Sequence, residues 1–149
     1  MIAIASDHGG LETKEEIKNF LQSAGHTVAD LGTNNSESVD YPDFGIDLSR
    51  RVAAGEFEKG ILVCGTGIGM SIVANKFPGV RAALCSEDYS AKMSRLHNDS
   101  NILVLPGRVI DTETAKGIVK IWFTTDFEGG RHQKRLDKIT AIEGKLRSK

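Results

Sequence analysis

The residues with the clearest chemical potential lie in the stretch ILVCGTGIGMS, residues 61–71. Cys64 ends an apolar run, and Gly65, Gly67 and Gly69 follow it at alternate positions. A glycine-rich turn that leads into a helix lets backbone N–H groups approach an anion, and the helix dipole adds to the attraction. The same groups would stabilise a thiolate at Cys64. The stretch therefore favours either an anion cradle or a reactive thiol.

The thiol of Cys64 needs its pKa lowered to react readily at neutral pH. A free cysteine has a pKa near ~8.5 and is only a few per cent ionised there. Lowering that pKa to about 7 requires about 2 kcal/mol of preferential stabilisation, which a helix N-terminus can supply. We therefore expect a reactive Cys64. The second cysteine, Cys85, precedes SEDYS and has no glycine loop beside it, so we interpret it as structural.

The glycine loop does not match the familiar phosphate-binding fingerprints. A GxGxxG pattern beginning at Gly65 would need glycine at position 70, where the chain has Met70, and it belongs after a first strand. No GK[ST] run of a P-loop is present, and residues 65–71 lack the arginine of a cysteine-based phosphatase loop. The four histidines are scattered without HExxH spacing, and the two cysteines do not form the close pairs of a zinc framework. We expect no metal.

The elements that must position these residues alternate along the chain. Strand-like apolar runs occur at residues 2–6, 27–32, 60–64, 80–85 and 101–106. Helical patterns occur at about 11–24, from Pro42 to about 54, and at 69–77, 87–97, 111–123 and 131–147. Short apolar strands separated by helices predict a parallel sheet covered on both faces. The last helix follows Gly129 and Gly130 with no strand after it, so we expect it to pack across the domain or onto another subunit.

Three polar clusters follow predicted strands, at SDHGG, CGTGIG and LPGR. In open α/β sheets ligands bind at the carboxyl ends of the strands, so these loops predict a common site. His97 ends a helical stretch just before the fifth strand, and Arg131 and Arg135 lie four apart on one helical face. Taken singly, His97 fits a helix cap or surface residue, and Arg131 and Arg135 fit a pair of solvated charges.

Size and composition limit the other classes of function. The 149 residues are enough for one domain with one substantial core. The formal net charge of −1 does not favour nucleic-acid binding, and no apolar run is long enough to span a membrane. Met1 leads directly into a strand-like run without a signal-peptide pattern, so we expect a cytoplasmic protein.

Seven motifs, in order and spacing, resemble the type B ribose-5-phosphate isomerases, a family that includes galactose- and allose-6-phosphate isomerases. They are SDHGG, DYPD, GILVCGTGIGMSIVANK, VRAALCSE, SRLHNDSN, LPGRV and EGGRHQKR. The resemblance runs from Met1 to about Glu143. It implies a three-layer α/β/α sandwich with a five-stranded parallel, Rossmann-like sheet and a C-terminal helix. It also implies interconversion of ribose 5-phosphate and ribulose 5-phosphate without a metal or organic cofactor, in a homodimer that can pair into a tetramer.

The resemblance also implies roles for individual residues. Cys64 resembles the base that moves a proton between the first two sugar carbons, and His97 resembles the acid that opens the furanose ring. Some relatives have an acidic base just past the glycine loop, but this chain has Met70 there. The remaining implied site residues contact substrate and are Asp7, His8, Tyr41, Gly65, Thr66, Gly67, Ile68, Gly69, Asn98 and Arg108, with Asp7 and Thr66 also placed near the chemistry. Arg131 and Arg135 resemble phosphate ligands contributed across the dimer interface.

Two other functions stay open at this level. A hexose-phosphate isomerase acting on allose 6-phosphate or galactose 6-phosphate lies within the same family. A sugar-phosphate or nucleotide sensor would keep the phosphate ligands but show no turnover. Turnover of the three sugar phosphates, and dependence on Cys64, discriminate among these functions.

Overall fold

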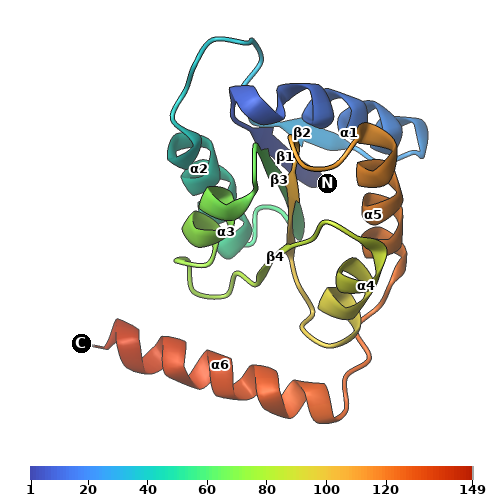
Figure 1. Ribbon diagram of the computed structural model, residues 1–149. Coiled ribbons are helices and arrows are strands. Elements are labelled where there is room, and N and C mark those ends of the chain that lie inside the picture. The colour runs from blue at the N-terminus through green and yellow to red at the C-terminus, as the bar shows by residue number, and fades with distance from the viewer. Residues whose placement is uncertain (149) are drawn as a thin grey trace.

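Five parallel strands form the centre of the protein in the computed structural model, which describes residues 1–148 (Figure 1). The strands are β1 (Ile2–Ser6), β2 (Val28–Asp30), β3 (Lys59–Cys64), β4 (Ala82–Leu84) and β5 (Ile102–Pro106), in the order β2-β1-β3-β5-β4. All pairings are parallel. The predicted sheet is confirmed, but β2 and β4 are shorter than the runs 27–32 and 80–85 predicted. They are the edge strands, so each has a hydrogen-bonding partner on one side only.

The helices alternate with the strands as the sequence predicted. They are a short 3₁₀ turn η1 (His8–Gly10), followed by α1 (Leu11–Ser23), α2 (Tyr41–Ala53), α3 (Ile68–Ala74), α4 (Asp88–Leu96), α5 (Thr112–Thr124) and α6 (Arg131–Arg147). Several begin with residues that stabilise a helix start. Asp111, for example, accepts a hydrogen bond from the backbone N–H of Thr114 at 2.7 Å, and Pro42 occupies the first turn of α2.

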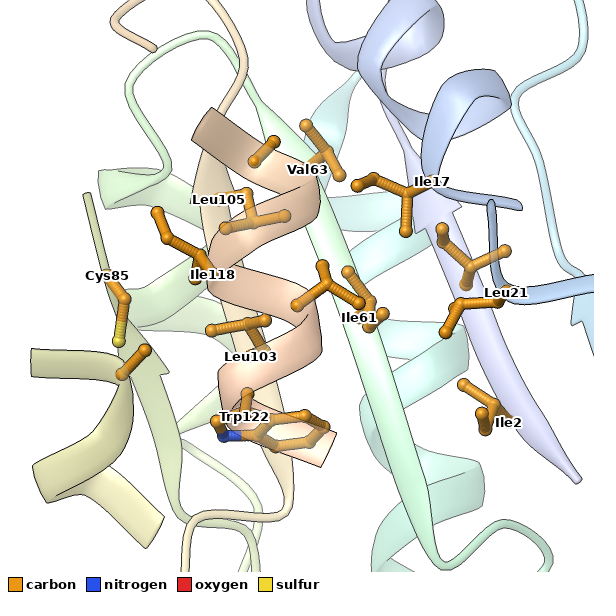
Figure 2. Close-up of a cluster of buried hydrophobic side chains, with 14 residues drawn as sticks. Ile2, Ile17, Leu21, Ile61, Val63, Cys85, Leu103, Leu105, Ile118 and Trp122 are labelled. Atoms are coloured by element: carbon orange, nitrogen blue, oxygen red, sulfur yellow. The ribbon is translucent and has the colours of Figure 1, made fainter. Parts of the chain in front are cut away.

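The sheet is buried on both faces, which divides the core in two. On one face α1, α4 and α5 cover apolar side chains of β1, β3 and β5, with Trp122 and Ile118 of α5 lying over Leu103 and Ile61 (Figure 2). On the other face α2 and α3 cover the alternate residues of the same strands, including Leu62 and Cys64. Because side chains alternate along a strand, a strand covered on both faces reads as the continuous apolar run seen in ILVC.

The strand order places a topological switch point between β1 and β3. From β1 the chain crosses to β2 on one side, whereas from β3 it crosses to β4 on the other side. The loops that leave β1 and β3 therefore diverge to opposite faces, with α1 on one face and α3 on the other. Ligands bind at the crevice that such a divergence opens at the carboxyl ends of the strands. Both SDHGG and CGTGIG border this crevice.

The last helix, α6, extends away from the layered body (Figure 1). It is tied near its C-terminal end by the Glu143 carboxylate, which accepts a hydrogen bond from the backbone N–H of Gly79 at 3.1 Å. Its apolar residues Ile139, Ile142 and Leu146 are 44%, 50% and 62% exposed. Within residues 1–148, no helix combines the length and apolar character required to cross a bilayer.

Substitution of Gly10 tests how closely the loop after β1 must approach β3. A Cβ at Gly10 would lie 2.6 Å from the carbonyl oxygen of Val63, which is backbone and cannot move aside cheaply. We expect Gly10→Ala to lower the free energy of unfolding in urea by about 1–3 kcal/mol. The matched control is Gly117→Ala within α5, where the new methyl group meets only Asp88 at 3.9 Å. In this control the free energy of unfolding should rise by up to about 1 kcal/mol, because alanine replaces glycine within a helix. Equal effects of the two changes would contradict the close approach.

Candidate active site

Three loops at the carboxyl edge of the sheet are joined to one another by backbone hydrogen bonds. The N–H of Gly107 donates to the carbonyl of Cys64 at 2.8 Å, and the N–H of Arg108 donates to that of Gly65 at 3.0 Å. The N–H of Asp7 donates to the carbonyl of Val63 at 3.3 Å. These bonds continue the pairing of β1, β3 and β5 past the strand ends, so the sheet fixes the three predicted clusters relative to one another.

Arg108 crosses this edge between two glycines. A Cβ at Gly9 would lie 3.2 Å from the Cζ of Arg108, and a Cβ at Gly65 would lie 3.4 Å from its Cδ. The absence of side chains at these positions lets the arginine lie directly against both loops while Arg108 stays exposed to solvent. An exposed guanidinium held in this way is suited to binding a phosphate through paired hydrogen bonds.

Cys64 lies at the end of β3 with 5% of its surface exposed. Hydrogen bonds from the backbone N–H groups of Met70, Gly67 and Thr66 favour its thiolate, as the sequence predicted. Burial outweighs them and raises the pKa of the Cys64 thiol, and the negative charge of Asp7 raises it further. The prediction of a lowered pKa is therefore wrong, because the strand end is more deeply desolvated than its position in the sequence reveals.

The glycine loop is shaped by its neighbours. Gly67 caps α3 with a φ of 77°, in the left-handed region that glycine adopts without strain. A Cβ at Gly69 would overlap the ring of Tyr41, so the tyrosine lies directly on the loop. The hydroxyl of Thr66 accepts a hydrogen bond from the N–H of Ile68 at 3.2 Å, and both residues are exposed. The loop thus presents backbone and Thr66 beside Cys64.

Asp7 and His8 are fixed on the other side of the crevice. The carboxylate of Asp7 accepts a hydrogen bond from the N–H of Gly10 at 3.0 Å, which closes the η1 turn. Nδ1 of His8 accepts a hydrogen bond from the N–H of Val39 at 3.1 Å. In a neutral imidazole the proton then lies on Nε2, which can donate to a ligand.

The remaining predicted residues form a second cluster around the end of α4. His97 caps this helix, and the carbonyl of Asn98 accepts a hydrogen bond from Nε of Arg81 at 2.8 Å. The segment that leads into α6 is attached here, since the N–H of Glu128 donates to the carbonyl of Leu96 at 3.1 Å. Arg131 and Arg135 follow on the first turns of α6, both exposed.

Within one chain the two clusters lie at opposite ends of the strands, the first at the carboxyl ends and the second at the amino ends. Cys64 pairs with Pro106 at the carboxyl end of β5, whereas His97 precedes Ile102, the first residue of that strand. Four residue steps along a parallel strand span about 13 Å. The structure therefore brings Asp7, His8, Tyr41, the loop 65–69 and Arg108 together, and it places His97, Asn98, Arg131 and Arg135 elsewhere.

One group at the second cluster was not anticipated from the sequence. His97, Glu128 and His132 each place one potential ligand atom within 4.8 Å of the others. Spacing along the chain gave no signal for it, because the residues come from the end of α4, the connecting segment and α6. The one clue in the sequence was a histidine within EGGRHQKR, a stretch otherwise rich in charge, and the structure shows that this histidine, His132, is buried.

Comparison with known proteins identifies the class to which this fold and site belong. The model of the ribose/galactose isomerase family matches residues 2–139. The chain belongs to this family.

Individual relatives match over nearly the whole chain. Ribose-5-phosphate isomerase B of Escherichia coli is 51% identical over 142 residues, covering 95% of each protein. The structure of Clostridium thermocellum ribose-5-phosphate isomerase B superimposes with a TM-score of 0.95 at 52% identity, over 97% of this chain and 98% of that one. The structure of ribose-5-phosphate isomerase B from Mycoplasma genitalium, with ribulose 5-phosphate bound, gives a TM-score of 0.93 at 41% identity, over 96% and 95% of the chains.

The environment of Cys64 predicts how its reactivity depends on pH. Because burial raises its pKa, the fraction of thiolate at pH 7 is below that of a free cysteine and grows as the pH rises. We expect the rate of alkylation of Cys64 by iodoacetamide to increase continuously from pH 7 to about 9. Peptide mapping follows the modified site, with free cysteine as the reference. A rate that is already constant at pH 7 would show a thiolate stabilised beyond what this geometry provides.

Proposed function

We propose that the chain is an aldose–ketose isomerase that interconverts D-ribose 5-phosphate and D-ribulose 5-phosphate. The observation that carries this proposal is the carboxyl-edge cluster: a thiol at a strand end, three backbone N–H groups directed at it, and an arginine held across the same loops. A reaction through an enediolate intermediate requires a group that can accept and return a proton, beside groups that stabilise the oxyanion, and this cluster supplies both. The ribulose 5-phosphate bound to the Mycoplasma genitalium relative supports the same substrate class.

Cys64 is the base in this mechanism. Its thiolate removes the proton from C2 of the open-chain aldose, a proton passes from the C2 hydroxyl to the C1 oxygen of the enediolate, and the sulfur then returns its proton to C1. The backbone of Gly65–Gly69 and the hydroxyl of Thr66 face the developing negative charge on the oxygens, where one preorganised donor is worth about 10²–10³ in rate. Met70 is fully buried in the core and does not supply an alternative base.

The remaining groups bind and prepare the sugar. Asp7 and His8 contact its ring oxygen and hydroxyls, and Tyr41 covers the glycine loop. His97 donates the proton that opens the furanose ring, and Asn98 holds the reacting end. The phosphate is bound by Arg108 together with Arg131 and Arg135, which lie one helical turn apart at about 6 Å between Cβ atoms.

Because the two clusters are separated within one chain, each proposed active site combines residues from two chains. A single sugar phosphate cannot reach from Cys64 to His97 when the length of β5 lies between them. In a two-fold homodimer the same residues meet in pairs, because each chain gives its carboxyl-edge cluster to one site and its second cluster to the other. We therefore assign His97 and Asn98, as well as Arg131 and Arg135, to the neighbouring chain's site. This extends the trans contribution beyond the two arginines that the sequence resemblance implied.

The wider setting follows from the same chemistry. The proposed isomerase works as a single-domain homodimer, or as a pair of dimers, with α6 at the interface, and uses no metal or organic cofactor. Cys64 and Cys85 are both free thiols, which fits the reducing cytoplasm. Allose 6-phosphate and galactose 6-phosphate are the alternative substrates of the family.

Turnover on three sugar phosphates tests the proposed function. We expect kcat/KM for ribose 5-phosphate to exceed that for allose 6-phosphate and galactose 6-phosphate, and Cys64→Ala to lower kcat by at least about 10³-fold while remaining folded. Cys85→Ala, at the other free thiol, is the matched control and should keep its activity. A higher kcat/KM on either hexose would change the substrate assignment, and wild-type kcat in Cys64→Ala would remove the thiol from the mechanism.

Mixed dimers test the assignment of residues to the two chains. When Cys64→Ala subunits exchange with His97→Asn subunits, one site of the mixed dimer collects both defects and the other is intact. Random exchange should then restore up to about a quarter of wild-type activity. Cys64→Ala with Arg135→Ala should behave in the same way.

The control for this experiment uses two variants of the second cluster. In a dimer of His97→Asn with Arg135→Ala each site keeps one defect, so exchange should restore nothing. Recovery in this control, or none in the mixture of Cys64→Ala with His97→Asn after exchange is verified by mass spectrometry, would show that His97 serves the site of its own chain.

A further inference from the structure

Two histidines from separate elements stack on each other in the second cluster. The ring of His97, at the C-terminal cap of α4, lies 4.2 Å from the ring of His132, with 16° between their planes. His132 is the second residue of α6 and is 3% exposed. The proposed function assigns a role to His97 but none to His132.

The burial of His132 is costly for an imidazole. Its Nε2 atom is inaccessible to solvent and has no hydrogen-bond partner among residues 1–148. A carboxylate oxygen of Glu128 lies 3.7 Å from Nε2, which is beyond hydrogen-bonding distance. An unpartnered buried polar atom costs about 1–3 kcal/mol, so its position calls for an explanation other than stability.

A shared metal ion explains the arrangement poorly. His97, Glu128 and His132 are close enough to be considered as ligands. A metal binds an imidazole nitrogen in the plane of the ring, so two histidine ligands of one ion point their nitrogens toward a common centre. Nearly parallel rings stacked at 4.2 Å instead direct their nitrogens side by side. This geometry favours contact between the ring faces.

The charges around His132 favour its neutral form. Burial lowers the pKa of His132, and the neighbouring His97, Arg131 and Arg135 lower it further, whereas Glu128 acts in the opposite direction. A neutral aromatic ring presents its electron-rich face to a protonated imidazole stacked on it. The ring of His132 is therefore suited to support His97 as a proton donor.

Backbone contacts fix this pair to the phosphate-binding helix. The N–H of Glu128 donates to the carbonyl of Leu96 at 3.1 Å, and the N–H of His132 donates to that of Gly129 at 3.1 Å. His97 is thus held on one side by the end of α4 and on its ring face by the start of α6, beside Arg131. A shift of His132 would tilt the ring of His97 without removing it.

We propose that His132 is a positioning residue for ring opening, its ring face setting the plane of the His97 imidazole. This proposal rests on the proposed function, in which His97 donates the proton. If the proposal holds, ring opening requires an aromatic ring stacked on His97. A ring without nitrogen atoms can then replace His132, but an aliphatic side chain cannot.

The test compares His132→Leu with His132→Phe in the intact dimer. For His132→Leu we expect kcat on ribose 5-phosphate to fall about 10- to 100-fold, the cost of a misplaced catalytic group, with KM within about twofold of wild type. For His132→Phe we expect kcat within about fivefold of wild type. Exchange of the C1 proton of ribulose 5-phosphate with solvent needs Cys64 but no ring opening, and should stay within about threefold of wild type in both variants. NMR detects this exchange.

The outcomes separate positioning from a purely structural or metal-binding role. Equal kcat losses in His132→Phe and His132→Leu, or an exchange rate that falls together with kcat, would overturn the proposal. If His132→Leu does not fold, His132→Phe decides alone, and a kcat as low as that of His97→Asn would overturn it. His26→Leu is the matched control, since His26 contacts the ring of Phe123 outside the site and should keep its activity. A wild-type protein without turnover would refute the proposed function itself.

Discussion

The strand β3 is paired on both sides and covered on both faces, and the site depends on this constraint. It pairs with β1 along five residues and with β5 along five, so both neighbours take their register from it. Leu62 and Cys64 face α2 and α3, while Ile61 and Val63 face α1 and α5. The side chains from Ile61 to Cys64 cannot shift without disturbing a core, which holds Cys64 at one height relative to the loops after β1 and β5.

The polarity of the sheet is the basis of the proposal that each site is built from two chains. All five strands point the same way, so every loop of the carboxyl edge lies on one side and every helix-to-strand connection on the other. His97 belongs to such a connection, between α4 and β5. Within one chain the length of β5 therefore lies between His97 and Cys64. The dimer in the proposed mechanism follows from this polarity and from the reach of one substrate molecule.

Periodicity and turn chemistry were enough to predict the sheet, the helix order and the carboxyl-edge cluster. The alternation of apolar runs and amphipathic stretches predicts the sheet and the helix order, because β3 and β5 are long enough to leave clear apolar runs. The ends of β2 and β4 were less predictable, since edge strands lose pairing that the sequence pattern does not record. The start of α6 at Arg131 was predicted because Gly129 and Gly130, both with positive φ, interrupt the chain before it.

Properties that depend on surroundings could not be predicted in the same way. The direction of the pKa shift at Cys64 comes from a balance between burial and three N–H groups, and the sequence indicates only the second. The placement of His97 away from Cys64 follows from the direction of β5, whereas the motif resemblance implied that both residues act on one substrate. The stacking of His97 on His132 joins two segments with no common pattern, so only the folded chain reveals it.

In the proposed mechanism, helix α6 links assembly to substrate binding. Its first turns carry Arg131 and Arg135, and further along it Ile139, Ile142 and Leu146 expose apolar surface at helical spacing. Burial of that surface against a second chain would supply the free energy of association, at about 25 cal/mol per Å². The arginines would then hold a phosphate that touches both chains. A ligand that binds only the assembled form stabilises it by mass action, so substrate and dimer should strengthen each other. The same helix also carries His132, so the orientation of His97 would depend on the docking of the segment that would hold the proposed dimer together.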